Sequence, residues 1–463
     1  MHRRTPSVLI AALALGFVVD ARAQVHAAPR PLPPVALSQS GEDGPFARRT
    51  PATHVAEKTR GAVVMLRAMQ TIPAKLNADD VGRTTNLGAG IVFDRRGYVV
   101  TNYHVVANVQ KIDATLSDGR KTTARRINFD AKADLAVLKL DGPGEYPTVS
   151  LSEGVTPIEG EWAIAIGNPY GLTNSLAWGV VSHVDRDMKL PNNEMSHNLI
   201  QVSAAINPGN SGGPLFTVNG QLLGITSAIR SNSQGIAFAI TTKRVLEVVK
   251  TLMPSPISLG TMGLAINEDK ASAHSLVEVS AVEAGSPADR AGFIKGDRII
   301  GVGKDNIRTG FDLERAFWDR QFGESLTFKV KDKRSVDLLI DNVGAKLTHT
   351  ELVWRKLGIW ALEVPATRVK HINHEYAGGL LVVSVAPDSC AAKAGLLPGD
   401  VMLGVINSKD AWATKEAGNL TYFMRDESAG GESVVDVLFM RDGELAPKTK
   451  MQIPIERATR STN

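Results

Sequence analysis

Short apolar or alternating runs, each bounded by turn-forming residues, dominate the chain from about Thr53 to Lys250. The clearest runs are Gly88–Phe93, Tyr98–Thr101, Asp134–Leu140, Trp162–Ile166 and Gln221–Ile225. Turn signals such as Ser-Asp-Gly and Val-Asn-Gly separate such runs, as they do in β-hairpins. Because long amphipathic helices do not alternate with these runs, the pattern predicts antiparallel strands in a barrel or a pair of sheets.

One stretch of this region has helical periodicity instead. Apolar residues recur at helical spacing from Thr242 to Met253, and Pro254 and Pro256 then prevent the helix from continuing. We therefore expect a helix to close the first domain, which we place at residues 53–253.

The last part of the chain contains an internal repeat. Ser-Pro-Ala-Asp-Arg-Ala-Gly-Phe-Ile-Lys-Gly-Asp, which begins at Ser286, aligns without gaps with Ser-Cys-Ala-Ala-Lys-Ala-Gly-Leu-Leu-Pro-Gly-Asp, which begins at Ser389. Two copies are too few for a solenoid. We therefore expect two tandem domains, over residues 257–343 and 346–457, followed by a tail at 458–463. Each copy is predicted to be a small β-rich unit with a short helix.

The first 23 residues have the pattern of a secretory signal. A basic start is followed by an apolar run from Val8 to Val19, and Ala21-Arg22-Ala23 has the form of a cleavage site. The run is shorter than the ~18 residues that span a bilayer, so we expect a cleaved signal and no stable membrane insertion, rather than an anchor. Residues 24–52 are rich in proline and are expected to form an extended, poorly ordered leader.

Composition narrows the function further. A formal net charge of +4 over 463 residues is too weak an excess to predict binding to nucleic acid. Cys390 is the single cysteine, so the chain has no internal disulfide and must rely on large apolar cores. The sequence has neither a cysteine-ligated zinc motif nor a His-Glu-x-x-His motif, and we predict no metal and no cofactor.

Three motifs point to nucleophilic catalysis. His104 follows an apolar strand in Thr-Asn-Tyr-His-Val-Val, and a strand end is a rigid place for a general base. Asp134 begins the run Asp-Leu-Ala-Val-Leu-Lys-Leu, where a buried carboxylate needs a partner. Ser211 lies among glycines in Asn-Pro-Gly-Asn-Ser-Gly-Gly-Pro-Leu, which predicts a tight turn.

These residue types form a complete set for acyl transfer. A serine hydroxyl is a weak nucleophile, so a neutral histidine must accept its proton, and a carboxylate must hold that histidine in the right tautomer. The developing oxyanion needs backbone N–H donors, and the amides of Gly209 and Ser211 are placed to supply them. We therefore predict an acyl-transfer enzyme with Ser211 as nucleophile, His104 as general base and Asp134 as the carboxylate that orients it.

Two other interpretations compete with this one. Gly209-x-Ser211-x-Gly213 also matches the nucleophile elbow of α/β-hydrolases, but that fold places Asp and His after the serine, whereas here both precede it. The second alternative is a non-proteolytic chaperone or scaffold in which the repeated domains do the work. The intact set of three residues argues against a pure scaffold, although both activities can coexist in one protein.

With their flanking residues, these motifs resemble the HtrA/DegP family of trypsin-fold serine proteases. The resemblance covers about residues 53–457 and rests on blocks that include Gly97–Val106, Asp134–Lys139, Ala165–Pro169, Ala204–Leu215 and Gly235–Ile240. It implies a mainly β chain, in which a trypsin-like double antiparallel β-barrel is followed by two small β-rich PDZ domains. It also implies a periplasmic, homotrimeric enzyme of protein quality control and the stress response that cleaves unfolded proteins.

The resemblance implies further site residues as well. The primary specificity pocket would have two walls, formed by Ala205 and Ile206 and by Thr226, Ser227 and Ala228. In the PDZ domains, Met262-Gly263-Leu264 and Leu357-Gly358-Ile359 are similar to the loop whose amides receive the C-terminal carboxylate of a peptide. We therefore expect unfolded polypeptides as substrates and free C-termini as ligands of the repeated domains.

Overall fold

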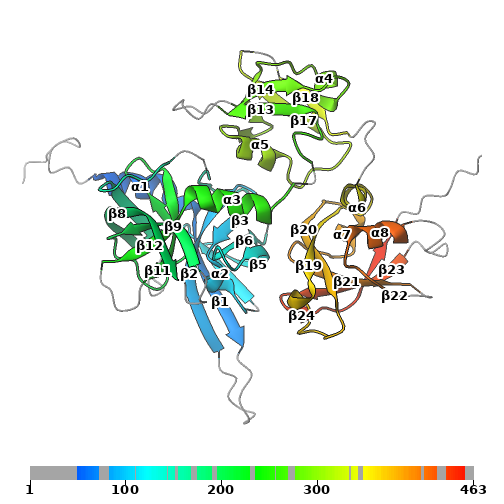
Figure 1. The fold of residues 1–463 in the computed structure, drawn as a ribbon, viewed down its shortest axis with the longest axis horizontal. Helices are drawn as coiled ribbons and strands as arrows, with labels where there is room; N and C mark the ends of the chain where they lie inside the picture. Colours follow the sequence, from blue (N-terminus) through cyan, green and yellow to red (C-terminus); the bar gives the residue numbers. More distant parts are fainter. Residues whose placement is uncertain are drawn as a thin grey trace, which may run out of the picture. The chain divides into compact units, whose positions relative to one another are not determined.

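The structure, a computed structural model, describes residues 49–453 except 72–82, 110, 143, 152–154, 168–174, 190–194, 230–234, 256, 269–276, 333–334, 342–347, 408–410 and 425–433. This part of the chain forms two closed barrels of antiparallel strands followed by two further sheets (Figure 1). The mainly β architecture predicted from the short apolar runs is therefore confirmed. Within the described residues, no helix combines the length and apolar character needed to cross a membrane.

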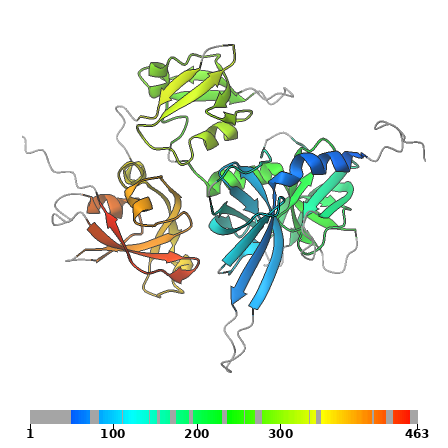
Figure 2. The same ribbon diagram turned by 180° about the vertical axis from the view of Figure 1, so that it is seen from behind.

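The first barrel has the strand order β1-β2-β3-β6-β5-β4. Its strands are β1 (Val63–Thr71), β2 (Arg83–Asp94), β3 (Tyr98–Thr101), β4 (Lys111–Leu116), β5 (Lys121–Asp130) and β6 (Leu135–Leu140). β1 and β2 pair antiparallel, with Val63 opposite Ile91, and their far ends run on as a two-stranded ribbon (Figure 2). Inward side chains such as Leu66, Val99 and Leu138 are fully buried and fill the barrel.

The second barrel has the order β10-β11-β12-β9-β8-β7. Its strands are β7 (Trp162–Gly167), β8 (Ser175–Lys189), β9 (Met195–Val202), β10 (Pro214–Phe216), β11 (Leu222–Ile229) and β12 (Ala237–Thr241). β10 and β11 pair antiparallel around a turn at Gly220, whose φ is 75°. Ser211 therefore precedes a β-hairpin, not the helix that a nucleophile elbow requires, which excludes the α/β-hydrolase alternative.

Two helices flank the barrels. The predicted helix is confirmed as α3 (Thr242–Leu252), whose first turn is capped by the Thr241 side chain. The expectation of an extended leader up to residue 52 is wrong at its end, because α1 (Pro51–Thr59) begins inside it. Pro51 stands at the first turn, where its fixed φ suits a helix and its missing N–H costs no hydrogen bond, and Thr50 caps it. A short 3₁₀ turn (Arg60–Ala62) leads into β1, and residues 24–48 lie outside the described chain.

The two copies of the repeat share a common succession of elements, to which the second copy adds one helix, a 3₁₀ turn and one further strand. The first contains β13 (Leu264–Glu268), β14 (Val277–Val282), α4 (Pro287–Ala291), β15 (Arg298–Val302), β16 (Asp305–Asn306), α5 (Gly310–Ala316), β17 (Ser325–Val330) and β18 (Val336–Leu339). The second contains α6 (His349–Leu357), β19 (Ile359–Pro365), a 3₁₀ turn (Ala366–Arg368), β20 (Gly378–Val385), α7 (Cys390–Lys393), β21 (Val401–Ile406), β22 (Ala411–Ala413), α8 (Ala417–Phe423), β23 (Val434–Arg441), β24 (Glu444–Leu445) and β25 (Thr449–Gln452). The antiparallel sheets have corresponding strand orders, β13-β14-β15-β17-β18 in the first copy and β19-β20-β21-β23-β24 in the second. Each copy has its own apolar core.

One backbone contact recurs at the same place in both copies. Gly263 lies against Ser286, which caps α4, and Gly358 lies against Ser389, which caps α7. A β-carbon added at either glycine would lie 2.2 Å from the serine Cβ, and both glycines have a positive φ, of 73° and 72°. Both turns therefore require glycine for two reasons, conformation and space.

Candidate active site

His104 lies on α2 (Tyr103–Val106), the short helix that follows β3. Two backbone hydrogen bonds fix this helix to Asp134: the N–H of Tyr103 donates to the Asp134 carbonyl at 3.1 Å, and the N–H of His104 donates to Asp134 Oδ1 at 2.9 Å. The side chain of Asn102 donates to the same Asp134 carbonyl at 2.9 Å. The histidine is thus held by its backbone as well as its ring, as a general base requires.

The Asp134 carboxylate is buried and accepts hydrogen bonds on both oxygens. Its Oδ2 lies 2.8 Å from His104 Nδ1 and 3.0 Å from the hydroxyl of Ser227, which donates to it. An ionised carboxylate can only accept, so Nδ1 carries the ring proton and Nε2 remains available as a base. The apolar run had predicted that Asp134 begins a strand, but β6 begins at the next residue, Leu135. Asp134 itself has a φ of 52°. Its carboxylate is thereby directed to the histidine and away from the strand.

Ser211 is partly exposed, and its hydroxyl donates to the backbone carbonyl of Ser227 at 2.9 Å. Ser227 therefore contacts both Ser211 and Asp134, so all three predicted catalytic residues are gathered around one point of β11. Within the described residues, no hydrogen bond joins Ser211 to His104. The serine hydroxyl must rotate away from the Ser227 carbonyl before its proton can reach the imidazole.

The loop that carries Ser211 packs closely on the first barrel. The Ser211 carbonyl accepts from the Ala89 N–H at 2.8 Å, and Gly212, with a φ of 83°, lies so close to β2 and β3 that a β-carbon would be 2.2 Å from Thr101 Oγ1. Gly209 has a φ of 105°. In the described structure, the N–H groups of Gly209 and Ser211 donate to no protein acceptor. Both amides thus lack a protein acceptor among the described residues, and their role as oxyanion donors stays a prediction.

The residues of the predicted specificity pocket differ in their exposure and in their hydrogen bonds. Ala205 is exposed and Ile206 is buried in the apolar core of the second barrel. The Thr226 hydroxyl donates to the carbonyl of Asn210 at 2.6 Å, and the Ser227 hydroxyl donates to Asp134. These two hydroxyl groups hold the serine loop and the aspartate in place, while Ala228 continues along β11.

The predicted peptide-binding loops lie at equivalent places, directly before β13 and β19. In the first, the amides of Met262, Gly263 and Leu264 donate to carbonyl groups of the preceding turn at distances of 2.9–3.2 Å. In the second, the Gly358 amide donates to the Trp354 carbonyl at 2.9 Å, at the end of α6. A peptide carboxylate at either loop would have to replace these internal hydrogen bonds.

Sequence reasoning missed the roles of Ser227 and Asn102. It placed Ser227 only in the wall of a pocket, whereas the structure shows its hydroxyl donating to the Asp134 carboxylate. The signal that could have found it is a pair of hydroxyl residues, Thr226 and Ser227, inside the otherwise apolar run Leu-Leu-Gly-Ile-Thr-Ser-Ala-Ile. Buried hydroxyl groups need partners, and here the partners belong to the catalytic loops.

Comparison with known proteins places this geometry in a family. Residues 88–225 match the family described as "Trypsin-like peptidase domain", and residues 278–330 match a "PDZ domain". The "Probable periplasmic serine endoprotease DegP-like" of Hahella chejuensis is 34% identical over 344 residues, which cover 70% of this chain and 72% of the relative. The chain belongs to the DegP-like serine endoproteases.

Other DegP-like relatives agree with this assignment. The protein of the same description from Chlamydia muridarum is 32% identical over 381 residues, covering 77% of this chain and 73% of its own length. That of Chlamydia trachomatis is 34% identical over 341 residues, covering 69% and 66%. The predicted serine endopeptidase is therefore confirmed at the level of the DegP-like family. The PDZ prediction is confirmed for the first copy of the repeat and stays a prediction for the second.

Proposed function

We propose that the chain is a periplasmic endopeptidase of protein quality control, which cleaves unfolded polypeptides through an acyl-enzyme on Ser211. The observation that carries this proposal is the buried Asp134 carboxylate, which holds His104 at 2.8 Å and is connected through Ser227 to the Ser211 hydroxyl. The DegP-like relatives are named as periplasmic, which supports the compartment. The predicted signal at residues 1–23, which would deliver the chain there, lies outside the described residues.

Each group has a distinct part in the proposed reaction. After the Ser211 hydroxyl rotates towards the ring, His104 Nε2 takes its proton as the oxygen attacks the substrate carbonyl. Asp134 stabilises the resulting imidazolium through Nδ1–H. The amides of Gly209 and Ser211 donate to the oxyanion, and each such donor contributes about 2.7–4 kcal/mol to transition-state stabilisation. His104 then protonates the leaving amine. In the second half, His104 takes a proton from the water that attacks the acyl carbon and returns it to the Ser211 oxygen, which releases the product carboxylate.

The function and its specificity can be tested together by mapping the new termini in a denatured substrate by mass spectrometry. The proposed pocket walls, Ala205 and Ile206 on one side and Thr226 to Ala228 on the other, contain no acidic residue. A basic side chain would lose its hydration there without gaining a partner. We expect cleavage after small aliphatic residues such as Val and Ala in most sites. A majority of cuts after Lys or Arg would contradict the pocket assignment, and no cuts in any denatured protein would contradict the function.

We also propose that the second copy of the repeat, residues 346–457, is a PDZ domain like the first at 257–343. The support is the shared order of elements and the equivalent contacts of Gly263 with Ser286 and of Gly358 with Ser389. Both domains would bind free C-termini at the loops before β13 and β19, once the internal hydrogen bonds of those loops open. The protease domain would then occupy residues 53–253, and α1 would begin two residues before it.

A homotrimer is the assembly that the family resemblance implies, and an exposed apolar patch supports a contact between copies. Trp162 and Trp178 lie on the outer face of the second barrel, 46% and 60% exposed, with ring centroids 5.3 Å apart. Leu176 and Val180 are exposed on the same face of β8. Adjacent exposed tryptophans are typical of protein interfaces, because burying them removes a large apolar area from water.

If this patch joins the copies, Trp178→Asp will convert the trimer to monomers, because a desolvated carboxylate without a partner is strongly unfavourable. Light scattering after size-exclusion chromatography measures the mass directly. Ile294→Asp is the matched control, since Ile294 is 56% exposed but lies in the first repeat. A variant at Trp178 that remains trimeric would show that the contact between copies is elsewhere.

A further inference from the structure

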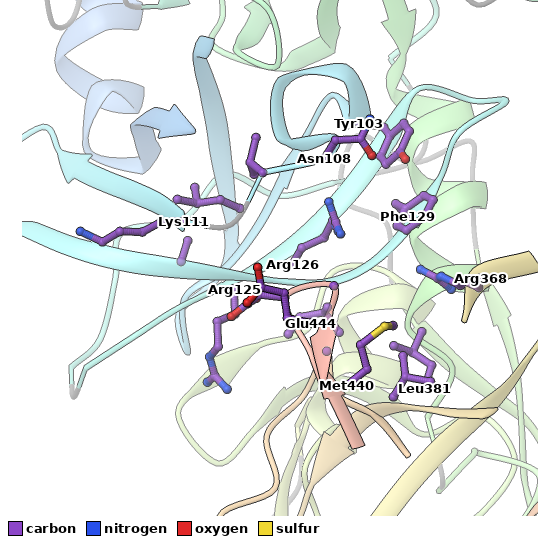
Figure 3. A pocket seen from close by; sticks show the side chains of 18 of the residues that line it. Tyr103, Asn108, Lys111, Arg125, Arg126, Phe129, Arg368, Leu381, Met440 and Glu444 are labelled. Atoms are coloured by element: carbon purple, nitrogen blue, oxygen red, sulfur yellow. The ribbon is translucent and has the colours of Figure 1, made fainter. Parts of the chain in front are cut away.

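A cleft of about 660 Å³ lies between β5 of the first barrel and the second repeat. The barrel contributes Tyr103 and Phe129 to its lining, and the repeat contributes Arg368, Leu381 and Met440 (Figure 3). Its volume is in the range of ordinary small-molecule sites, about 300–1,000 Å³. None of the functions described above uses this cleft.

Two arginines from different domains meet at one aromatic ring of the cleft. The guanidinium carbon of Arg126 lies 5.2 Å from the centre of the Phe129 ring, and that of Arg368 lies 4.2 Å from it. Arg126 donates to the Val106 carbonyl at 2.5 Å, and both terminal nitrogens of Arg368 donate to Asn128 Oδ1 at 3.4 Å. Among the described residues, neither arginine forms an ion pair. Most of their N–H donors are therefore unused.

The surroundings disfavour these two charges. Burial lowers the pKa of Arg368 to about 10, and the neighbouring charge of Arg126 contributes to the decrease. Burial also lowers the pKa of Arg126. Both side chains nevertheless stay protonated at neutral pH. An anion placed between them would compensate the repulsion and the lost hydration.

The acidic residues of the cleft do not fill this place. Asp141 pairs with Arg125 at 3.0 Å, and Glu444 lies beside Arg125, away from Arg368 and Phe129 (Figure 3). Asp442 also lines the cleft, and its charge partly opposes the lowering of the Arg126 pKa, but in the described structure it forms no ion pair with Arg126 or Arg368. The arginine pair is thus left for a ligand.

One wall of the cleft is aromatic and aliphatic. The rings of Tyr103 and Phe129 are stacked, with centroids 4.3 Å apart and planes 13° from parallel. Ile127, Leu381 and Met440 complete this surface. A ligand that contacts both the arginine pair and this wall therefore combines an oxyanion with an apolar group.

We propose that this cleft binds a carboxylate attached to an apolar group, the chemical form of the C-terminus that each cleavage releases. Hydrolysis of a peptide bond consumes one water and yields one carboxylate and one amine, so the enzyme itself supplies this ligand. The planar fork of arginine matches a carboxylate with two parallel hydrogen bonds. The proposal rests on the peptidase function above, and on the prediction that cleavage follows aliphatic residues.

The cleft adjoins the catalytic helix. Tyr103 forms its aromatic wall and directly precedes His104, and its own N–H donates to the Asp134 carbonyl at 3.1 Å. A product carboxylate in the cleft would therefore lie near Tyr103, the residue next to the proposed general base.

Calorimetry of the full chain carrying Ser211→Ala with 3-phenylpropionate tests the proposal. This probe has an apolar group and a carboxylate but no peptide backbone, so it cannot add a strand to a PDZ sheet as a peptide does. We expect saturable binding of 3-phenylpropionate and none of 3-phenylpropionamide, which lacks the charge. Arg368→Met and Arg126→Met should each weaken binding at least tenfold. Arg355→Met, which removes an exposed cation on α6 outside the cleft, should leave it unchanged.

No binding, equal binding of the amide, or unchanged binding in both cleft variants would overturn the proposal. If Arg126→Met disturbs the barrel, as circular dichroism would show, Arg368→Met decides alone, because Arg368 lies in the second repeat. The binding measurement uses an inactive serine variant and needs no proteolysis. Failure of the carboxylate site and failure of the proposed peptidase function would therefore be seen in different experiments.

Discussion

Cleavage of a denatured substrate will fall by about 10⁴-fold or more when Ser211 is replaced by alanine, and by a similar factor for His104→Ala. The two residues act as a unit, so the loss of either removes nearly all the covalent catalysis. The fold should survive both changes, because the Ser211 hydroxyl makes one hydrogen bond, to a carbonyl, and the His104 side chain is half exposed. Gel-based cleavage rates and thermal unfolding of the same preparations measure the two effects.

The chain offers a matched control for the histidine. His197 on β9 pairs with Asp187 at 2.9 Å through Nδ1, as His104 does with Asp134, but the pair is exposed and lies outside the catalytic cluster. His197→Ala should leave the cleavage rate unchanged. Activity within tenfold of the wild type in purified Ser211→Ala or His104→Ala would refute the catalytic assignment.

Gly212→Ala will destabilise the protein strongly, by about 2–5 kcal/mol. A left-handed φ of 83° costs alanine roughly 1–2 kcal/mol. The new β-carbon would also lie 2.2 Å from Thr101 Oγ1 and 2.3 Å from the Ala89 carbonyl, which are themselves joined by a 2.6 Å hydrogen bond. Neither neighbour can move without disturbing β2 or β3. Thermal unfolding should therefore begin about 5–10 °C lower than in the wild type.

Gly119→Ala serves as a control that separates the energetic cost of a positive φ from the cost of a steric clash. Gly119 has a φ of 86° in the turn between β4 and β5, but a β-carbon there would meet nothing within 4 Å. Only the conformational cost should appear, about 1–2 kcal/mol. Equal destabilisation by the two substitutions would mean that the packing of the Ser211 loop on the first barrel is looser than the structure shows.

The strands, helix α3 and the repeat could be predicted from the sequence. The strands and the helix follow from local hydrophobic periodicity, and the repeat follows from the alignment of two segments of the chain with each other. The sequence was not sufficient for α1, where the first helical residue is a proline that composition assigned to an extended leader. The strand pattern also left the closure into two barrels open, as either a barrel or a pair of sheets, and only the family resemblance implied a double barrel. Closure depends on pairings such as that of β1 with β4, which join residues far apart in the chain.

The candidate site was predictable to the extent that its chemistry requires particular residue types. His104, Asp134 and Ser211 stood out because no other combination in the chain offers a base, a carboxylate and a hydroxyl in such motifs. Ser227 did not stand out, since its importance comes from a hydrogen bond to Asp134 between two different barrels. The cleft at Arg126 and Arg368 could not be predicted from the sequence either, because the two arginines are far apart in the chain and only the fold brings both to the Phe129 ring.

The duplicated contact of a turn glycine with a helix-capping serine sets a rule for building hybrids of the two repeats. In each copy, a glycine before the first strand and a serine at the cap of the short helix fit each other closely, and their geometry is nearly the same in both copies. A crossover point between these two positions would therefore still pair a glycine with a serine, which makes that stretch a suitable junction for a chimera. A hybrid that replaced either Gly263 or Gly358 by a residue with a side chain would lose the fit to the capping serine.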